Sequence, residues 1–236
     1  MFLFNKDNQP ITSISDWKKE INPDHWKIGY SAYSLANFVL NENGLEQIKK
    51  VITEIIKEDV IIERAIPEYE VKFDDLGRGR FHDLGVFCRT TTSNKSVFVG
   101  IEAKVNETFR ETISEAYLSA TIKRLNGEPT NAPERIERLL KQNFGSKILD
   151  RHFDLRYQLL YATIGTLAVR SDVSFLFIIV FKTASYDEDT GNKNFSDYCC
   201  FINNVISEDI FFSIDDIKVH KLIIDNRELY SIYMYI

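Results

Sequence analysis

The segment 173–185 (VSFLFIIVFKTAS) constrains the fold most, because its residues 175–181 are apolar without interruption. A strand with one face in water alternates apolar and polar residues, whereas a continuous apolar run suits a strand covered on both faces by helices. The run is far shorter than the ~20 residues that a membrane-spanning helix needs. The preceding segment 153–170 (FDLRYQLLYATIGTLAVR) reads as a long apolar helix. The pair predicts a central strand of a sheet with a helix packed on it.

The remaining pattern predicts an α/β fold with a mixed β-sheet core flanked by helices. Further helices are predicted over 31–40, 44–58, 109–125 and 132–143. Strands are predicted over 61–73, 81–89 and 97–105, which follow one another as a meander. We expect a single domain, 1–236, with a core of about 43–182. A C-terminal mixed extension over 186–236 begins with a surface loop at 187–194 and ends in two strands, KVHKLIIDN and ELYSIYMYI.

The composition indicates a globular protein of a reducing compartment. The chain has 236 residues, of which 44% are hydrophobic and 27% are charged, enough to bury a core without disulfides or zinc. Its net charge of -6 excludes a globally basic nucleic-acid coat protein but allows a local basic groove. The cysteines are Cys88, Cys199 and Cys200, an odd number without framework spacing. No signal peptide is apparent at the start, so we expect a cytoplasmic protein with no membrane partner.

The hairpin 81–105 carries the most chemical information. In 97–105 every odd position is apolar and faces the core, so Glu102 and Lys104 share the other face. Asp83 and Glu102 are symmetric about the Thr92–Ser93 bond, and a hairpin that turns there places them opposite each other, with Cβ atoms about 5 Å apart. Two facing carboxylates repel each other, and a divalent ion between them removes the repulsion. Oxygen ligands of this kind suit Mg²⁺.

A third carboxylate is available on the preceding strand, and two alternatives remain open. If the first turn is centred near Leu76–Gly77, either Glu68 or Glu70 lies opposite Asp83, and the turn arithmetic mildly favours Glu70. By strand alternation His82 points to the face opposite Asp83, as a core-side packing residue.

Without further information, the carboxylates are equally well explained as a surface charge cluster. In that structural interpretation Lys104 only neutralises Glu102.

The phrases RFHDLGVF and VFVGIEAKV, within a helix–strand–strand–strand–helix–strand order, resemble the PD-(D/E)XK nuclease superfamily. Its fold is known as restriction-endonuclease-like. The phrases AIPEYEV, EAKVNETF and LRYQLLYATIGTLA resemble a poorly characterised family within it, and the resemblance covers about residues 30–182. One departure is that His82, not proline, precedes the aspartate. The resemblance implies a hydrolase that cleaves phosphodiester bonds with Mg²⁺ or Mn²⁺.

The resemblance also implies a role for individual residues. Asp83 and Glu102 would bind the metal, and we favour Glu68 as the third ligand because it lies in the AIPE phrase. Lys104 would contact the attacking water or the scissile phosphate, and Gln158 would support the site from the following helix. The catalytic residues implied are therefore Asp83, Glu102, Lys104 and Gln158.

The partner expected from this resemblance is nucleic acid, with DNA favoured. The side chains expected to hold its backbone are Arg78, Arg80 and Arg156, with the basic stretch Lys123, Arg124, Arg135, Arg138 and Lys141. The segment 77–80 (GRGR) reads as a turn, because it lacks the fingerprint of a phosphate-binding loop.

Two other functions remain open. One is a nuclease-fold module that binds nucleic acid or regulates without cleaving, which the acidic pI favours, and the other is a purely structural domain. The sequence is compatible with a homodimer but does not fix the oligomeric state.

Overall fold

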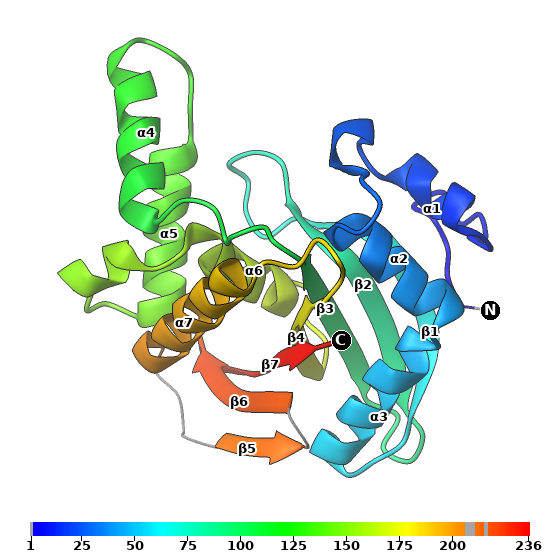
Figure 1. Ribbon diagram of the computed structural model, residues 1–236. Coiled ribbons are helices and arrows are strands. Elements are labelled where there is room, and N and C mark those ends of the chain that lie inside the picture. Colours follow the sequence, from blue (N-terminus) through cyan, green and yellow to red (C-terminus); the bar gives the residue numbers. More distant parts are fainter. Residues whose placement is uncertain (1, 206–210, 215–216) are drawn as a thin grey trace.

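The computed structural model describes residues 2–205, 211–214 and 217–236, and Figure 1 shows its helices and strands. Seven strands within these residues form one sheet in the order β1-β2-β3-β4-β7-β6-β5. The strands are β1 (Val60–Val71), β2 (Arg80–Thr90), β3 (Ser96–Lys104), β4 (Val173–Val180), β5 (Phe211–Ile214), β6 (Ile217–Ile224) and β7 (Arg227–Tyr235). The α-helices are α1 (Ile14–Glu20), α2 (Ser31–Asn41), α3 (Gly44–Ile56), α4 (Ile113–Leu125), α5 (Ala132–Phe144), α6 (Tyr157–Ala168) and α7 (Glu188–Asn204). Short 3-10 helices are η1 (Pro23–His25) and η2 (Asp150–Asp154).

The sheet is mixed, as the sequence predicts. Strands β1, β2 and β3 form an antiparallel meander, while β4 runs parallel to both β3 and β7. Strands β6 and β5 complete the other side in antiparallel pairing. The continuous apolar segment is therefore paired on both edges, and its residues from Phe175 to Phe181 are buried. The predictions of a central strand and of an α/β fold are confirmed.

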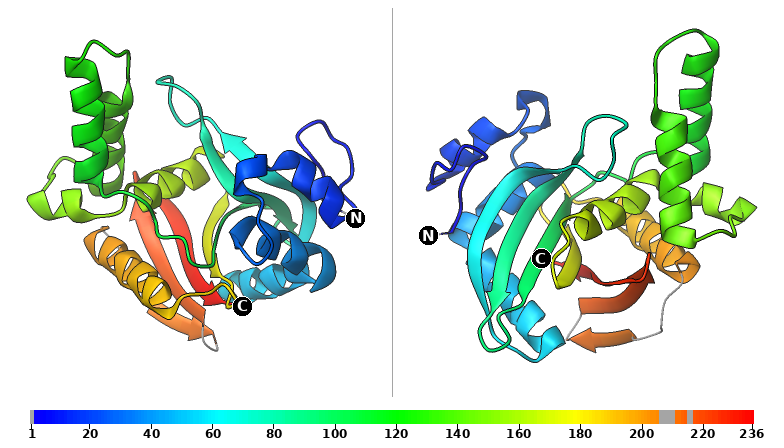
Figure 2. Two further views of the ribbon diagram at one scale, coloured as in Figure 1. Left: turned by 45° about the horizontal axis from the view of Figure 1, so that its top comes forward. Right: turned by 180° about the vertical axis from the view of Figure 1, so that it is seen from behind.

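Helices cover the sheet on both faces, and each face has its own core (Figure 2). On one face, Val99 and Ile101 of β3 pack with Leu35 of α2 and Ile48 of α3. On the other face, Ile178 of β4 belongs to a cluster that includes residues of α5, α6 and α7. The odd positions of β3 thus point to α2 and α3, and the even positions point toward α6.

The sequence predicts a surface loop at 187–194, but this prediction is wrong. In the structure the segment forms the N-cap and the first turns of α7. The Asp187 carboxylate accepts the N–H of Thr190 at 2.8 Å and caps the helix, and Glu188 and Asp189 add negative charge to its first turn. Gly191 fits because the Tyr186 ring lies where a Cβ atom would be. Turn-forming residues and capping residues are largely the same types, which explains the wrong prediction.

The C-terminal residues predicted as an extension are part of the sheet. Strand β7 lies between β4 and β6, where Leu229 and Ile232 are fully buried, one in each core. No helix within the described residues is both long and apolar enough to cross a bilayer.

Candidate functional site

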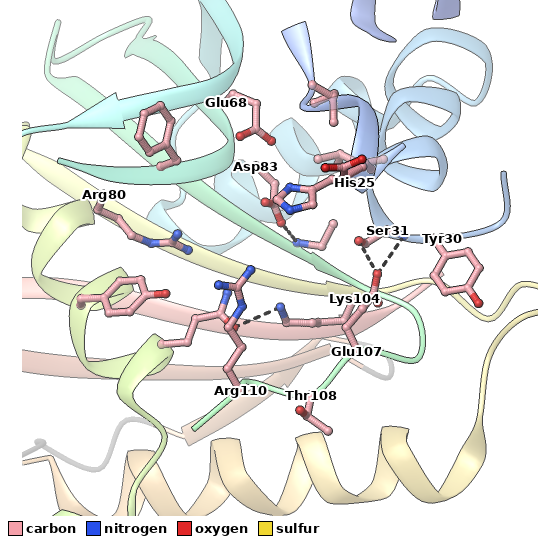
Figure 3. Close-up of a pocket in the computed structure, with 18 of the residues that line it drawn as sticks. His25, Tyr30, Ser31, Glu68, Arg80, Asp83, Lys104, Glu107, Thr108 and Arg110 are labelled. Carbon is pink, nitrogen blue, oxygen red and sulfur yellow. Dashed lines mark hydrogen bonds between the residues drawn. The ribbon is translucent and has the colours of Figure 1, made fainter. Parts of the chain in front are cut away.

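The site lies where strands β2 and β3 part. The two strands pair from Arg89–Ser96 to Leu84–Ile101, and beyond that point β2 continues along β1 while β3 continues along β4. The register is symmetric about the Thr92–Ser93 bond, as predicted. Asp83 and Glu102 are therefore the first residues beyond the last pair of the ladder. A cleft of about 840 Å³ opens at this end of the sheet (Figure 3).

The side chain of Asp83 accepts a backbone hydrogen bond from β3 at the point where the β2–β3 ladder has ended. Its carboxylate accepts the N–H of Ala103 at 2.7 Å, a hydrogen bond made across the gap between the two strands. Burial, and next the charge of Glu102, raise the pKa of Asp83 to about 6, although the charge of Lys104 opposes the shift. The side chain is thus fixed in position at the cleft while its negative charge is costly.

Glu68 is the third carboxylate of the cleft. The pairs on either side of it in the β1–β2 ladder place Glu68 opposite Asp83, whereas Glu70 lies opposite Phe81. The Glu70 carboxylate accepts the N–H of Gly79 at 2.8 Å and does not line the cleft. The turn is centred one residue earlier than the sequence arithmetic assumed, so the mild preference for Glu70 as the residue opposite Asp83 was wrong.

Glu102 is buried behind the cleft lining, with a side chain 1% exposed. One carboxylate oxygen forms an ion pair with Arg80 and lies 3.3 Å from Nδ1 of His82, and the other accepts Nε2–H of Gln158 at 2.9 Å. Burial by itself raises the pKa of Glu102, but the charge of Arg80 and the hydrogen bond from His82 outweigh it and lower this pKa to about 2. Glu102 is therefore ionised at any ordinary pH.

Lys104 does not neutralise Glu102 directly. Its Nζ donates to Oε1 of Gln158 at 3.2 Å, so Gln158 links the ammonium group to the Glu102 carboxylate. Among the described residues, no carboxylate lies within ion-pair distance of Lys104, and its Nζ lies 5.3 Å from the ring centre of Phe109. The positive charge faces the cleft.

The residues do not form a ready-made metal cage. Within the described part of the chain, no group of three or more His, Cys, Asp and Glu side chains is arranged to hold an ion. Both oxygens of Glu102 already have protein partners, as described above. The assignment of Glu68, Asp83 and Glu102 as metal ligands stays a prediction.

His82 is buried, as predicted, but its direction differs from the prediction. Strand alternation places it with Leu84, which packs toward α2 and α3. Its ring instead lies between β3 and α6, where a Cβ atom on Gly100 would come within 2.7 Å of it. The alternation is broken between His82 and Leu84, the place where the pairing of β2 with β3 ends. Burial lowers the pKa of His82, and the neutral ring supports Glu102.

The predicted arginines divide into two groups. Arg80 lines the cleft, pairs with Glu102 and stacks on the Tyr161 ring at 4.6 Å. Arg78 is exposed and Arg156 pairs with Asp197 at 2.7 Å, and neither lines the cleft. Their substrate contacts stay predictions.

The basic stretch 123–141 is largely neutralised by ion pairs. Its three arginines pair with carboxylates as Arg124–Glu134, Arg135–Asp74 and Arg138–Asp75. This stretch therefore offers less free positive charge for a nucleic-acid backbone than its sequence suggests.

Sequence reasoning missed one wall of the cleft. The N-terminal segment 17–32 contributes several lining side chains, including Lys27 and Tyr30, and the loop after β3 contributes Arg110. The sequence of segment 17–32 contains no motif that indicates a function, and Arg110 belongs to no periodic pattern. Only the tertiary arrangement brings these residues to the carboxylates.

The stability of the metal-free protein should fall as pH rises from about 6.5 to 8.5. Burial, then the charges of Asp83 and Glu102, raise the pKa of Glu68 to about 8. A carboxyl whose pKa is raised on folding contributes stability below its unfolded pKa and loses it as pH rises through the folded pKa. His82, whose folded pKa is lowered, acts in the opposite direction only below about pH 6.5. Melting temperatures across this window test the expectation.

The matched variants are Glu68→Gln and Glu70→Gln. Glu68→Gln should melt higher than the parent at pH 8.5 and change little across the window, while Glu70→Gln should follow the parent. Each 1 kcal/mol corresponds to about 2–4 °C for a domain of this size. Parallel curves for Glu68→Gln and the parent would show that Glu68 does not titrate in this range.

Comparison with known proteins gives a family but no function. No curated protein and no solved structure matches the chain. Residues 10–234 match the family described as "Domain of unknown function (DUF6946)", which spans the cleft, the N-terminal wall and strand β7. The protein therefore belongs to the DUF6946 family.

Proposed function

We propose that the protein is a metal-dependent nuclease of the PD-(D/E)XK type, which hydrolyses phosphodiester bonds in nucleic acid. The observation that carries the proposal is the convergence of Glu68, Asp83, Glu102 and Lys104 at the point where β2 and β3 separate. A surface charge cluster would not need burial. Glu102 and Lys104 are buried, and Glu68 and Asp83 are half-buried beside them. Holding these charges together away from water costs free energy, which a catalytic or binding role accounts for.

The donor set fits Mg²⁺ or Mn²⁺. The ligands would be Glu68, Asp83 and Glu102, whose hard oxygens suit these ions. The carboxylates make one another's negative charge unfavourable: after burial, the charges of Asp83 and Glu102 raise the pKa of Glu68, and the charge of Glu102 raises that of Asp83. A bound divalent ion would supply a nucleophilic water at neutral pH and polarise the phosphate.

The protein groups would position and stabilise the substrate. Lys104 would donate to the attacking water or to a phosphate oxygen, as its charge faces the cleft without a carboxylate partner. Gln158 holds Lys104 and Glu102 in a fixed relation through its amide. Arg80 balances the charge of Glu102 in the metal-free protein.

The direct test is cleavage of generic DNA and RNA by the purified protein. We expect no cleavage in EDTA, and cleavage after Mg²⁺ or Mn²⁺ is added. Anomalous scattering from Mn²⁺-soaked crystals should place the ion beside Asp83 and Glu68. If no nucleic acid is cut under any metal condition, the nuclease proposal fails.

A second candidate is a nucleic-acid-binding or regulatory module without cleavage. The observation in its favour is that both oxygens of Glu102 are held by Arg80, His82 and Gln158. It predicts binding of nucleic acid without cleavage and no Mn²⁺ at the carboxylates.

The nuclease proposal also includes a nucleic-acid partner, a homodimer and a cytoplasmic location. DNA is the nucleic acid we propose. A homodimer is supported by an exposed apolar stripe on α4, made of Leu118, Ile122 and Leu125. The free thiols of Cys88, Cys199 and Cys200 suit a cytoplasmic location.

A further inference from the structure

We infer that the cleft takes an unpaired nucleic-acid strand rather than a duplex, with Arg110 holding a phosphate and Phe81 stacking on a base. The inference rests on the proposed function and specifies the substrate class of the same site. It depends on three features of the cleft: its N-terminal wall, its positive charges and its exposed aromatic ring.

The N-terminal segment 17–32 forms one wall of the cleft and is tied to its neighbours by hydrogen bonds. Thr183 donates to the carbonyl of Gly29 at 2.8 Å, and the Ser31 hydroxyl donates to the Glu107 carboxylate at 2.6 Å. These bonds tie the segment before α2 to the loops that follow β3 and β4. In Figure 1 this segment and the α4–α5 pair lie on opposite sides of the sheet. These hydrogen bonds hold the N-terminal segment in place as a wall of the cleft.

The size of the cleft suits a few nucleotides. Its volume of about 840 Å³ falls within the range of roughly 300–1,000 Å³ typical of small-molecule pockets. A duplex must present both strands to its protein partner, whereas a single strand can thread between two walls.

Positive charges without carboxylate partners lie on both walls. Six cleft-lining side chains can carry positive charge: His25, Lys27, Arg80, Lys104, Arg110 and Arg135. Arg80 and Arg135 are paired with Glu102 and Asp74. Among the described residues, Lys27, Lys104 and Arg110 have no carboxylate within ion-pair distance.

Arg110 is the best placed of these side chains for a phosphate. It is exposed, and in Figure 3 its side chain extends from the loop after β3 into the cleft, close in the view to Lys104. Its backbone carbonyl accepts Nη1–H of Arg156 at 2.8 Å, and within the described part of the chain its guanidinium has no carboxylate partner. A guanidinium can bind phosphate oxygens through two parallel hydrogen bonds. Arg110 therefore supplies a phosphate contact in the same cleft as the proposed catalytic lysine.

Phe81 supplies an aromatic face beside the carboxylates. It lies two residues before Asp83 on β2, lines the cleft and is 37% exposed. Bases stack on aromatic rings with little sequence preference, and this contact is available only to bases that have left the duplex.

Binding of fluorescent oligonucleotides in Ca²⁺ tests the inference, with gels to verify that the probes stay intact. The probes are a short mixed-sequence DNA strand, the same sequence as RNA, and its blunt DNA duplex. We expect one of the single strands to bind at least about tenfold more tightly than the duplex, equivalent to ~1.4 kcal/mol. The two single-strand probes distinguish DNA from RNA.

Variants locate the contact. Arg110→Ala should weaken strand binding about tenfold and reduce the salt slope by about one. Phe81→Ala should weaken strand binding about tenfold as well, whereas Phe81→Trp, which keeps an aromatic face, should bind the strand as tightly as the parent. The matched control is Arg170→Ala, because Arg170 is also exposed with a left-handed backbone (φ 60° against 61° for Arg110) but follows α6 at the other end of the sheet.

Equal or tighter binding of the duplex, or parental affinity in Arg110→Ala, would overturn the inference. If the duplex is preferred and is cleaved in Mg²⁺, the proposed function stands and only the strand preference is wrong. If no probe is bound and none is cut, both proposals fail.

Discussion

Replacing Lys104 with alanine is expected to slow metal-dependent cleavage by about 10²-fold or more, equivalent to about 2.7 kcal/mol of transition-state stabilisation. The ammonium group faces the cleft, where its contacts among the described residues are Gln158 and the Phe109 ring, so its charge is available to substrate. Mn²⁺ affinity should persist or rise slightly, because a like charge has left the neighbourhood of the ion. Single-turnover cleavage and Mn²⁺ titration measure the two effects.

The control for Lys104 separates catalysis from stability. Lys104→Met fills nearly the same volume and should lose activity to the same extent as Lys104→Ala. Lys95→Ala, at the exposed turn between β2 and β3, should behave as the parent. A Lys104→Ala protein that melts earlier but cuts as fast as the parent would rule out the catalytic role.

Replacing Asp83 with asparagine is expected to abolish Mn²⁺ binding and cleavage together. Asparagine keeps an oxygen that can accept the Ala103 N–H, so the hydrogen bond between β2 and β3 at this position should be retained. The melting temperature of the metal-free protein should stay level or rise near pH 7, since burial and Glu102 make the Asp83 charge unfavourable there. Titration calorimetry with Mn²⁺ and a cleavage assay give the result.

The chain offers a matched control for Asp83. Asp172 also accepts a backbone N–H at 2.7 Å, from Ser96 at the opposite end of β3. Asp172→Asn makes the same chemical change away from the cleft and should retain metal binding and cleavage. Parental Mn²⁺ affinity in Asp83→Asn would contradict the role of Asp83 as a ligand.

The fold could be predicted where the deciding forces are local. The alternation in 97–105 fixes which side chains face α2 and α3, and the position of the turn fixes the pairing of Leu84 with Ile101. The continuous apolar run identifies β4 as central because both of its faces must be covered. The start of α7 was missed because Asp187 caps a helix with the same residue types that form a turn.

The candidate site could be predicted only in part. The register brings Asp83 and Glu102 to one point, and it favours Glu68 over Glu70 once the turn is known. The separation of β2 from β3 is set by which neighbour each strand pairs with, so the direction of His82 was not predictable. The ion pairs that neutralise the basic stretch, and the approach of Arg110, depend on residues far apart in sequence.

Strand β7 has a consequence for how the molecule is made. It pairs Leu229 with Ser174 in the middle of the sheet, although it is the strand farthest along the sequence. Pairings between distant segments form slowly, and an unpaired apolar strand edge attracts other chains. During synthesis β4 emerges well before its second neighbour, so its edge stays open while the ribosome completes the chain. Until β7 pairs with it, this apolar edge is the part of the sheet most exposed to pairing with other chains.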